Sequence, residues 1–261
     1  MKESLSDISI SVQTERAIRD RLTIGIDLRK AGRFADALRH YAKLAEDIDC
    51  CRPILKGKFN HGLGVLHKVI GITTHSEEDL HTAISKYSWA QFFYEEAREP
   101  SLAMGSEANI GNVLLFLGRV DEALPYIERA EGYFTRMGEQ MELSQVEEIK
   151  TRALIQKCEY ELAHKYAVQC VGRIQHGVEQ DPLTEARATL TLADERLHKA
   201  EPIRLALIEE GSVSGAAKSL GLTHQGLNFI INTKYPELKQ IKVDGRGSRR
   251  NTEREARAVD L

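Results

Sequence analysis

A short pattern of glycine, arginine and alanine occurs twice in this chain and constrains its fold more than any other feature. The segments Gly25–Leu38 (GIDLRKAGRFADAL) and Gly111–Leu124 (GNVLLFLGRVDEAL) both read GxxxxxxGRxxxAL. The second glycine of each copy can adopt the left-handed backbone conformation that ends a helix. Small residues on either side of that turn allow two antiparallel helices to approach closely. The pattern therefore predicts helical hairpins.

The alanine of the pattern recurs at intervals that give the length of the repeated unit. A weaker copy surrounds Gly64 and has a longer connection, through Thr73–His81. Another weaker copy surrounds Thr151. The alanines of the four copies are 46, 40 and 40 residues apart, so we expect helices longer than those of a typical thirty-four-residue repeat. These alanines are Ala37, Ala83, Ala123 and Ala163.

The repeated units resemble tetratricopeptide (TPR) repeats over Arg16–Val178. Pro53, Pro100 and Pro182 fall between units, where residues that disfavour helix continuation are expected. The resemblance places Tyr41, Tyr87, Ile127 and Ala167 in the core of the second helices. It also implies a concave face that binds a peptide or protein partner. The residues that it nominates for this face are Lys58, His61, Asn109, Asn112 and Arg152, and Asn109 and Asn112 fit a solvated helix face equally well.

A second pattern begins near residue 200, after a predicted capping helix. Pro202 is expected to open a short helix, Ile203–Glu210, which Gly211 ends. Ser212 and Thr223 are predicted N-caps of two further helices, separated by a turn at Gly221. We expect the centre of this unit to contain Ala216, Ala217, Leu220, Leu222, Leu227 and Ile231.

This spacing is typical of a helix-turn-helix, and Ile203–Lys234 resembles the Fis type, with GAAKSLGL and Leu227 at the matching positions. The resemblance implies binding of double-stranded DNA, with the third helix in the major groove. Thr223, His224, Gln225 and Asn228 would face base edges, and Asn232 and Lys234 the DNA backbone.

The chain is acidic overall, with a net charge of −3, but its C-terminal part is basic. We expect the segment that follows Pro236 to form a flexible arm that contacts DNA phosphates. Its candidate contacts are Lys242, Arg246, Arg249 and Arg250. The predicted third helix departs from the Fis pattern, because it carries Phe229 and Ile230 where Arg and Lys are usual. The alternative function is therefore a scaffold in which Phe229 and Ile230 contact protein.

Composition agrees with an all-α protein, since aromatic residues make up only 6% and prolines number 6. No CxxC, P-loop, GxSxG or HExxH motif occurs, so we expect no enzyme activity, no metal and no cofactor. No apolar stretch has the length of a membrane span, and we expect a cytoplasmic location. A homodimer would suit palindromic DNA sites, although no heptads specify one. The predicted domains are 1–200 (repeat array with capping helix), 201–238 (helix-turn-helix) and 239–261 (basic tail).

Overall fold

The computed structural model describes residues 5–174 and 180–241, and every regular element within these ranges is helical. The predicted all-α fold class is therefore confirmed. The chain divides into two compact units, Met1–Ile149 and Lys150–Leu261. Within the described ranges, no helix is both long enough and apolar enough to cross a lipid bilayer.

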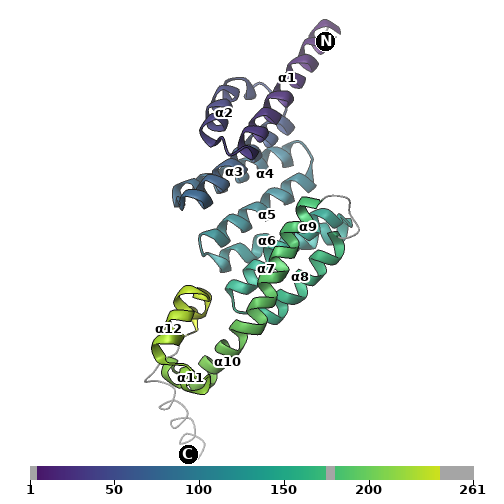
Figure 1. The fold of residues 1–261 in the computed structure, drawn as a ribbon. Coiled ribbons are helices and arrows are strands. Elements are labelled where there is room, and N and C mark those ends of the chain that lie inside the picture. Colours follow the sequence, from purple (N-terminus) through teal and green to yellow (C-terminus); the bar gives the residue numbers. More distant parts are fainter. Residues whose placement is uncertain (1–4, 175–179, 242–261) are drawn as a thin grey trace, which may run out of the picture. The chain divides into compact units, whose positions relative to one another are not determined.

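The first unit consists of consecutive helices that pack against their neighbours in the sequence (Figure 1). Contacts also join α1 to α3 and α3 to α5, so alternate helices lie close together. This arrangement is a stack of helical hairpins. Its helices are α1 (Leu5–Lys30), α2 (Phe34–Ile48), α3 (Pro53–Thr74), α4 (Glu77–Glu96), α5 (Pro100–Phe116) and α6 (Val120–Met137), with the first part of α7 (Gln140–Gln156).

Glycines in the first helix of each hairpin allow the second helix to pack closely. A Cβ atom on Gly25 would lie 2.8 Å from the ring of Tyr41, and one on Gly111 would lie 2.9 Å from Ile127. Real side chains do not approach so closely, so only glycine fits at these positions. The predicted core positions are confirmed, because Tyr41, Tyr87, Ile127 and Ala167 are all buried.

The turns between paired helices show how the weaker copies differ from the glycine-arginine pattern. Gly32 and Gly118 both have φ of +71° and end the first helices of the two clear copies. His75 (φ +56°) and Cys158 (φ +60°) occupy the same left-handed region in the other two. The predicted long connection through Thr73–His81 is wrong, because α3 has 22 residues, α4 has 20, and only His75 and Ser76 separate them.

The second unit contains the end of α7 and the remaining helices. Helices α8 and α9 lie side by side (Figure 1). The C-terminal helices follow α9 without a break at the predicted boundary after residue 200. The elements are α8 (Tyr160–Ile174), α9 (Gln180–Glu195), the π-helical turn η1 (Arg196–Ala200), α10 (Glu201–Glu210), α11 (Val213–Ser219), α12 (His224–Thr233) and the 3₁₀ turn η2 (Pro236–Gln240).

The π-helical turn explains why Pro202 does not interrupt the helix at this point. Proline lacks an N–H group, and its ring clashes with the carbonyl four residues earlier in an α-helix. That carbonyl belongs to His198, inside η1, where the wider π-helical geometry accommodates the ring. Helix α9 therefore continues through η1 into α10, and the predicted separate helix Ile203–Glu210 is the end of this longer helical segment.

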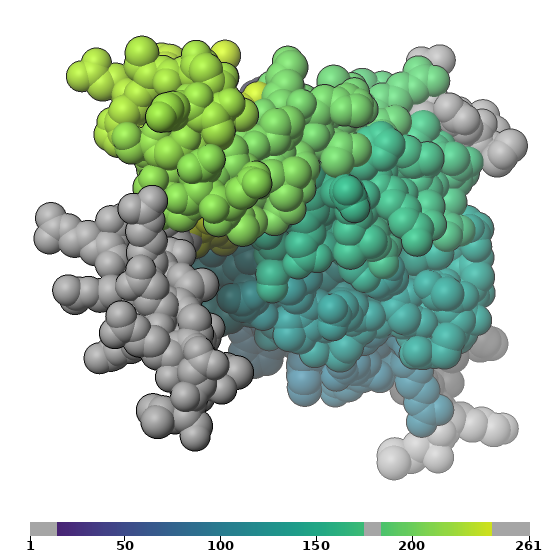
Figure 2. Space-filling view, turned by 90° about the horizontal axis from the view of Figure 1, so that it is seen from below, coloured from purple at the N-terminus to yellow at the C-terminus, as the bar shows by residue number. Residues whose placement is uncertain are grey.

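One hydrophobic core joins all the helices of the second unit. It extends from Leu154 on α7 to Leu238 on η2 and includes buried residues of α8, α9, α10, α11 and α12. The atoms of these C-terminal helices, coloured green to yellow-green, adjoin one another in the space-filling view of Figure 2. Residues on both sides of the predicted boundary after residue 200 therefore share one core. The three-domain division remains a prediction.

Candidate functional sites

The start of α11 is fixed by two residues that the sequence predicts as boundary signals. Gly211 has φ of +59° and ends α10, with its N–H bonded to the carbonyl of Leu207 at 3.1 Å. The Ser212 Oγ then accepts a hydrogen bond of 3.0 Å from the backbone N–H of Gly215. This is the predicted N-cap, and it satisfies a donor that the first turn of a helix leaves without a partner.

The turn between α11 and α12 is built in the same way. Gly221 has φ of +68°, and the N–H of Leu222 reaches back to the carbonyl of Ala217 at 2.7 Å. The Thr223 Oγ1 accepts a hydrogen bond of 3.0 Å from the N–H of Gly226 and caps α12. Both predicted caps and the predicted glycine turn are therefore present, and they fix the direction in which α12 leaves the turn.

One face of α12 lies in the core of the second unit. Leu227 and Ile231 are buried, as are Ala216 and Ala217 on α11. Leu220 is half-buried and packs against this core. The expectation that Leu222 fills the centre is wrong, because 39% of its surface is exposed. Leu222 lies in the turn before α12, where its side chain faces solvent instead of the space between the helices.

The opposite face of α12 and its first turn are accessible. Thr223, His224 and Gln225 are exposed, and Asn228 is half-buried. The Asn228 Nδ2 lies 3.3 Å from the His224 Nε2, so the two side chains interact across one helical turn. These polar groups therefore form a continuous surface, which we call the α12 polar face. Its members are Thr223, His224, Gln225, Asn228 and the exposed Asn232 and Lys234 at the end of the helix.

The α12 polar face carries little charge of its own. Within Thr223–Lys234 the only charged side chain is Lys234, and exposed lysines flank the helix at Lys218 and Lys239. Phe229 also projects from α12, with 62% of its surface exposed. The predicted flexible arm after Pro236 is wrong in its first part, because Pro236–Gln240 form η2 and Leu238 is buried in the core. Its candidate phosphate contacts, Lys242, Arg246, Arg249 and Arg250, lie outside the described residues.

A cluster of polar side chains anchors the segment after α12, and the sequence analysis did not identify it. The Arg196 Nε donates a hydrogen bond of 2.7 Å to the Glu237 Oε1, and the Tyr160 hydroxyl donates one of 3.3 Å to the same oxygen. The Arg196 guanidinium also lies 4.9 Å from the centre of the Tyr235 ring. The Gln240 amide donates to the backbone carbonyl of Gln156. These contacts hold η2, and with it the end of α12, against α7, α8 and η1.

The predicted peptide-binding residues occupy different environments. Asn109 on α5 is half-buried, with its Oδ1 3.5 Å from the Lys68 Nζ, whereas Asn112 is only 7% exposed. Arg152 is half-buried on α7 in the second unit. Lys58 and His61, by contrast, line one cavity in the first unit. The structure therefore brings two of the five predicted residues together at a cavity.

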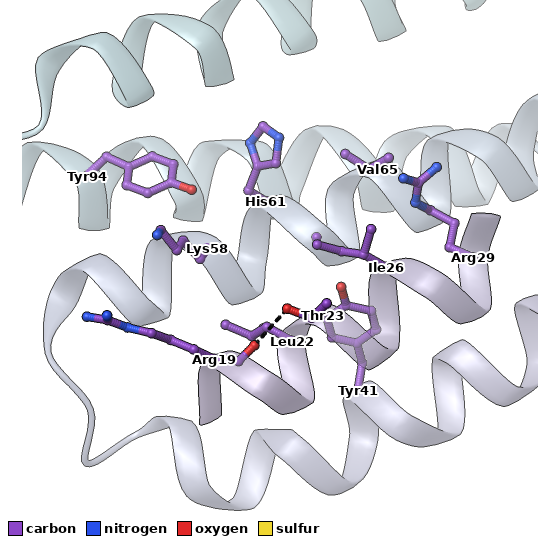
Figure 3. Close-up of a pocket in the computed structure, with 11 residues that line it drawn as sticks. Arg19, Leu22, Thr23, Ile26, Arg29, Tyr41, Lys58, His61, Val65 and Tyr94 are labelled. Carbon is purple, nitrogen blue, oxygen red and sulfur yellow. Dashed lines mark hydrogen bonds between the residues drawn. The ribbon is translucent and has the colours of Figure 1, made fainter. Parts of the chain in front are cut away.

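This cavity lies among α1, α2, α3 and α4 and has a volume of about 440 Å³ (Figure 3). We call it the α1–α4 cavity. Arg19 and Arg29 of α1 line it together with Lys58 of α3, and no carboxylate is among its described lining residues. Aliphatic side chains, two tyrosine rings, Thr23, His61 and Gly62 form the rest of its wall. These lining residues are Leu22, Thr23, Ile26, Tyr41, His61, Gly62, Val65 and Tyr94.

His61 is a buried titratable group in the wall of this cavity. Its ring lies edge-on to Tyr87, with the ring centres 5.4 Å apart, and its Nδ1 atom is buried without a hydrogen-bond partner among the described residues. Burial lowers the pKa of His61 to about 4, and the nearby positive charges of Lys68 and Arg29 act in the same direction. His61 is therefore neutral at physiological pH.

The residues that α1 and α4 contribute to this cavity were not predicted from the sequence. Arg19 and Arg29 lie on α1 ahead of the first clear repeat turn, and Tyr94 lies near the end of α4. Their signal in the sequence is weak, because only the stacking of α1 on α3 brings them together. Within the described residues, no group of three or more His, Cys, Asp or Glu side chains is arranged to hold a metal ion. No protein-family model matches the chain, and a comparison with curated proteins finds no match either.

Proposed function

We propose that this protein is a DNA-binding regulator in which a TPR-like array receives a partner and a C-terminal helix-turn-helix of the Fis type binds duplex DNA. The observation that carries the proposal is the arrangement of α12. Leu227 and Ile231 on one face are buried in the core, while Thr223, His224 and Gln225 on the first turn are exposed. A helix that reads a major groove needs such a fixed inner face and accessible polar residues at its N-terminal end.

The chemistry of the exposed residues supports base recognition more than phosphate binding. Gln and Asn side chains offer a donor and an acceptor that pair with adenine in the major groove. Gln225 and Asn228 are one helical turn apart, and His224 adds a further group that accepts or donates. Since Lys234 is the only charged side chain of the α12 polar face, nonspecific attraction to phosphates falls to the flanking lysines and to the basic segment that begins at Lys242.

Selection of bound duplexes from a random pool tests this proposal. We expect enrichment of a defined sequence by the full-length protein, and Gln225→Ala should relax the preference at the position that Gln225 reads. Gln169→Ala is the matched control, because Gln169 is an exposed glutamine on α8, outside the α12 polar face. The control should select the same sequence as the wild type. If the wild type, Gln225→Ala and Gln169→Ala all select the same sequence with the same preference, the assignment of Gln225 to base recognition is contradicted.

A scaffold function is the second candidate, and one observation favours it. Phe229 exposes 62% of its surface on α12, and exposed aromatic side chains often anchor protein partners. In this reading α12 contacts a protein partner through Phe229, beside the half-buried Ile230. Loss of a captured partner on Phe229→Asp, together with the absence of DNA binding by the wild type, would favour the scaffold.

A further inference from the structure

We infer that the α1–α4 cavity binds a small organic acid, with an aliphatic or aromatic body and a single carboxylate. This site goes beyond the proposed function, and it does not depend on whether α12 binds DNA. Its volume of about 440 Å³ falls within the usual range of small-molecule pockets. Side chains from four helices line it, as Figure 3 shows.

The charge of the cavity favours an anionic ligand. Three cationic side chains line it, and neither Arg29 nor Lys58 forms an ion pair or hydrogen bond with another described residue. Arg19 has only a distant partner, since its Nη2 lies 3.9 Å from the Glu15 Oε2. With no lining carboxylate to balance these charges, the cavity has a positive potential that a bound anion would neutralise. The body of the protein is otherwise acidic, so this concentration of positive charge is local.

The wall between the cations requires an apolar ligand body. Leu22, Ile26 and Val65 present aliphatic side chains, and Tyr41 and Tyr94 present aromatic rings. In Figure 3, Lys58 and Tyr94 lie towards one end of the cavity and Arg29 towards the other, with Ile26 beside Arg29. A ligand that buries hydrocarbon against this wall and holds its carboxylate against a cation at one end satisfies both kinds of surface.

The polar groups of the cavity favour a small molecule over an extended peptide. A bound peptide backbone needs a series of groups that both donate and accept hydrogen bonds, such as asparagine side chains. Among the described residues, no asparagine or glutamine lines the cavity, and the two asparagines predicted for that purpose, Asn109 and Asn112, lie on α5 outside it. Because an acidic peptide would also supply negative charge, it is the competing occupant that an experiment must distinguish from a small organic acid.

Calorimetric titration of the full-length protein with decanoate and with 3-phenylpropionate tests the inference. We expect at least one acid to bind saturably, at one molecule per chain. Decanamide, which has the same body as decanoate but no charge, should bind at least tenfold more weakly. The inference is overturned if neither acid binds, or if decanamide binds as tightly as decanoate. It is also overturned if an acidic hexapeptide of Asp and Leu binds while both acids fail.

Variants locate the bound acid. The double substitution Lys58→Met and Arg29→Met removes both unpaired charges, and we expect it to weaken binding at least tenfold. Lys30→Met is the matched control, because Lys30 is exposed on α1 beside Arg29 but does not line the cavity, and it should bind like the wild type. Ile26→Trp fills the cavity and should abolish binding. Thermal unfolding verifies that each variant is folded, and unchanged binding in both the folded double variant and the folded Ile26→Trp variant would contradict the site.

Discussion

The guanidinium of Arg196 and the carboxylate of Glu237 form an ion pair with 2.7 Å between Nε and Oε1, and their side chains are only 14% and 8% exposed. The pair joins η1 to η2 and so fixes the segment that follows α12. The Tyr160 hydroxyl donates to the same carboxylate oxygen, at 3.3 Å. The position of the α12 polar face within the second unit therefore depends on a polar contact as well as on apolar burial.

Arg196→Met should destabilise the protein by about 3–5 kcal/mol, because it leaves the buried Glu237 carboxylate without its cation. Urea unfolding followed by circular dichroism measures this change. Lys199→Met is the control, since Lys199 is 67% exposed and its ion pair with Glu195 has N and O 3.7 Å apart. The control should change stability by less than about 1 kcal/mol. Equal effects of the two substitutions would show that the buried pair has no special role.

Two glycines on α5 should respond to alanine in opposite directions. A Cβ on Gly111 would lie 2.9 Å from Ile127 and 3.2 Å from the backbone oxygen of Ala123, whereas one on Gly105 would meet nothing within 4 Å. Gly111→Ala should therefore destabilise the hairpin of α5 and α6 by about 1–3 kcal/mol through overpacking. Gly105→Ala should stabilise it by about 0.5–1 kcal/mol, because alanine favours the helix. Thermal melts of the two variants compare these effects, and stabilisation by Gly111→Ala would contradict the close packing.

Stability should fall on acidification because of His61. Its pKa in the folded protein is about 4, below the ordinary value of 6.5, so the unfolded chain binds more protons between these two pH values. The stabilisation that follows from a neutral His61 is complete above about pH 6.5 and is lost as the pH falls towards 4, by roughly 3 kcal/mol in total.

The measurement is the free energy of unfolding between pH 4 and pH 7. His61→Leu should reduce the slope of stability against pH in this window, because no proton can bind at that position in either state. The control is His81→Leu, since His81 is exposed on α4. The control should keep the slope of the wild type. An unchanged slope in His61→Leu would show that His61 does not titrate on unfolding.

The local signals of the sequence predicted the elements around α12 well. Gly211, Ser212, Gly221 and Thr223 all act through residues within four positions of themselves, so their roles can be inferred without knowledge of the rest of the fold. The close packing of the second helix at Gly25 was similarly predicted from the small residues of the repeat, although Tyr41 was not identified as the partner of Gly25. Short-range capping and a periodic small residue are therefore sufficient to predict these parts.

Contacts between distant residues could not be predicted in this way. Arg196 and Glu237 are 41 positions apart, and nothing in the sequence near either residue identifies its partner. The α1–α4 cavity combines side chains that are far apart in the sequence, on four helices, so the repeat pattern alone does not bring them together. The π-helical turn before Pro202 was missed because a proline at that position is also compatible with the start of a new helix.

Binding of the full-length protein to fluorescent duplex DNA, measured by anisotropy over a range of salt concentrations, tests the central claim most directly. We expect affinity to fall as salt rises, because phosphate contacts release counterions. Gln225→Ala with Asn228→Ala should weaken binding to a selected duplex by about 1–3 kcal/mol for each lost base contact, while Gln169→Ala binds like the wild type. Absence of binding by the wild type, or equal affinity of all three proteins with no dependence on salt, would contradict the assignment of α12 to DNA.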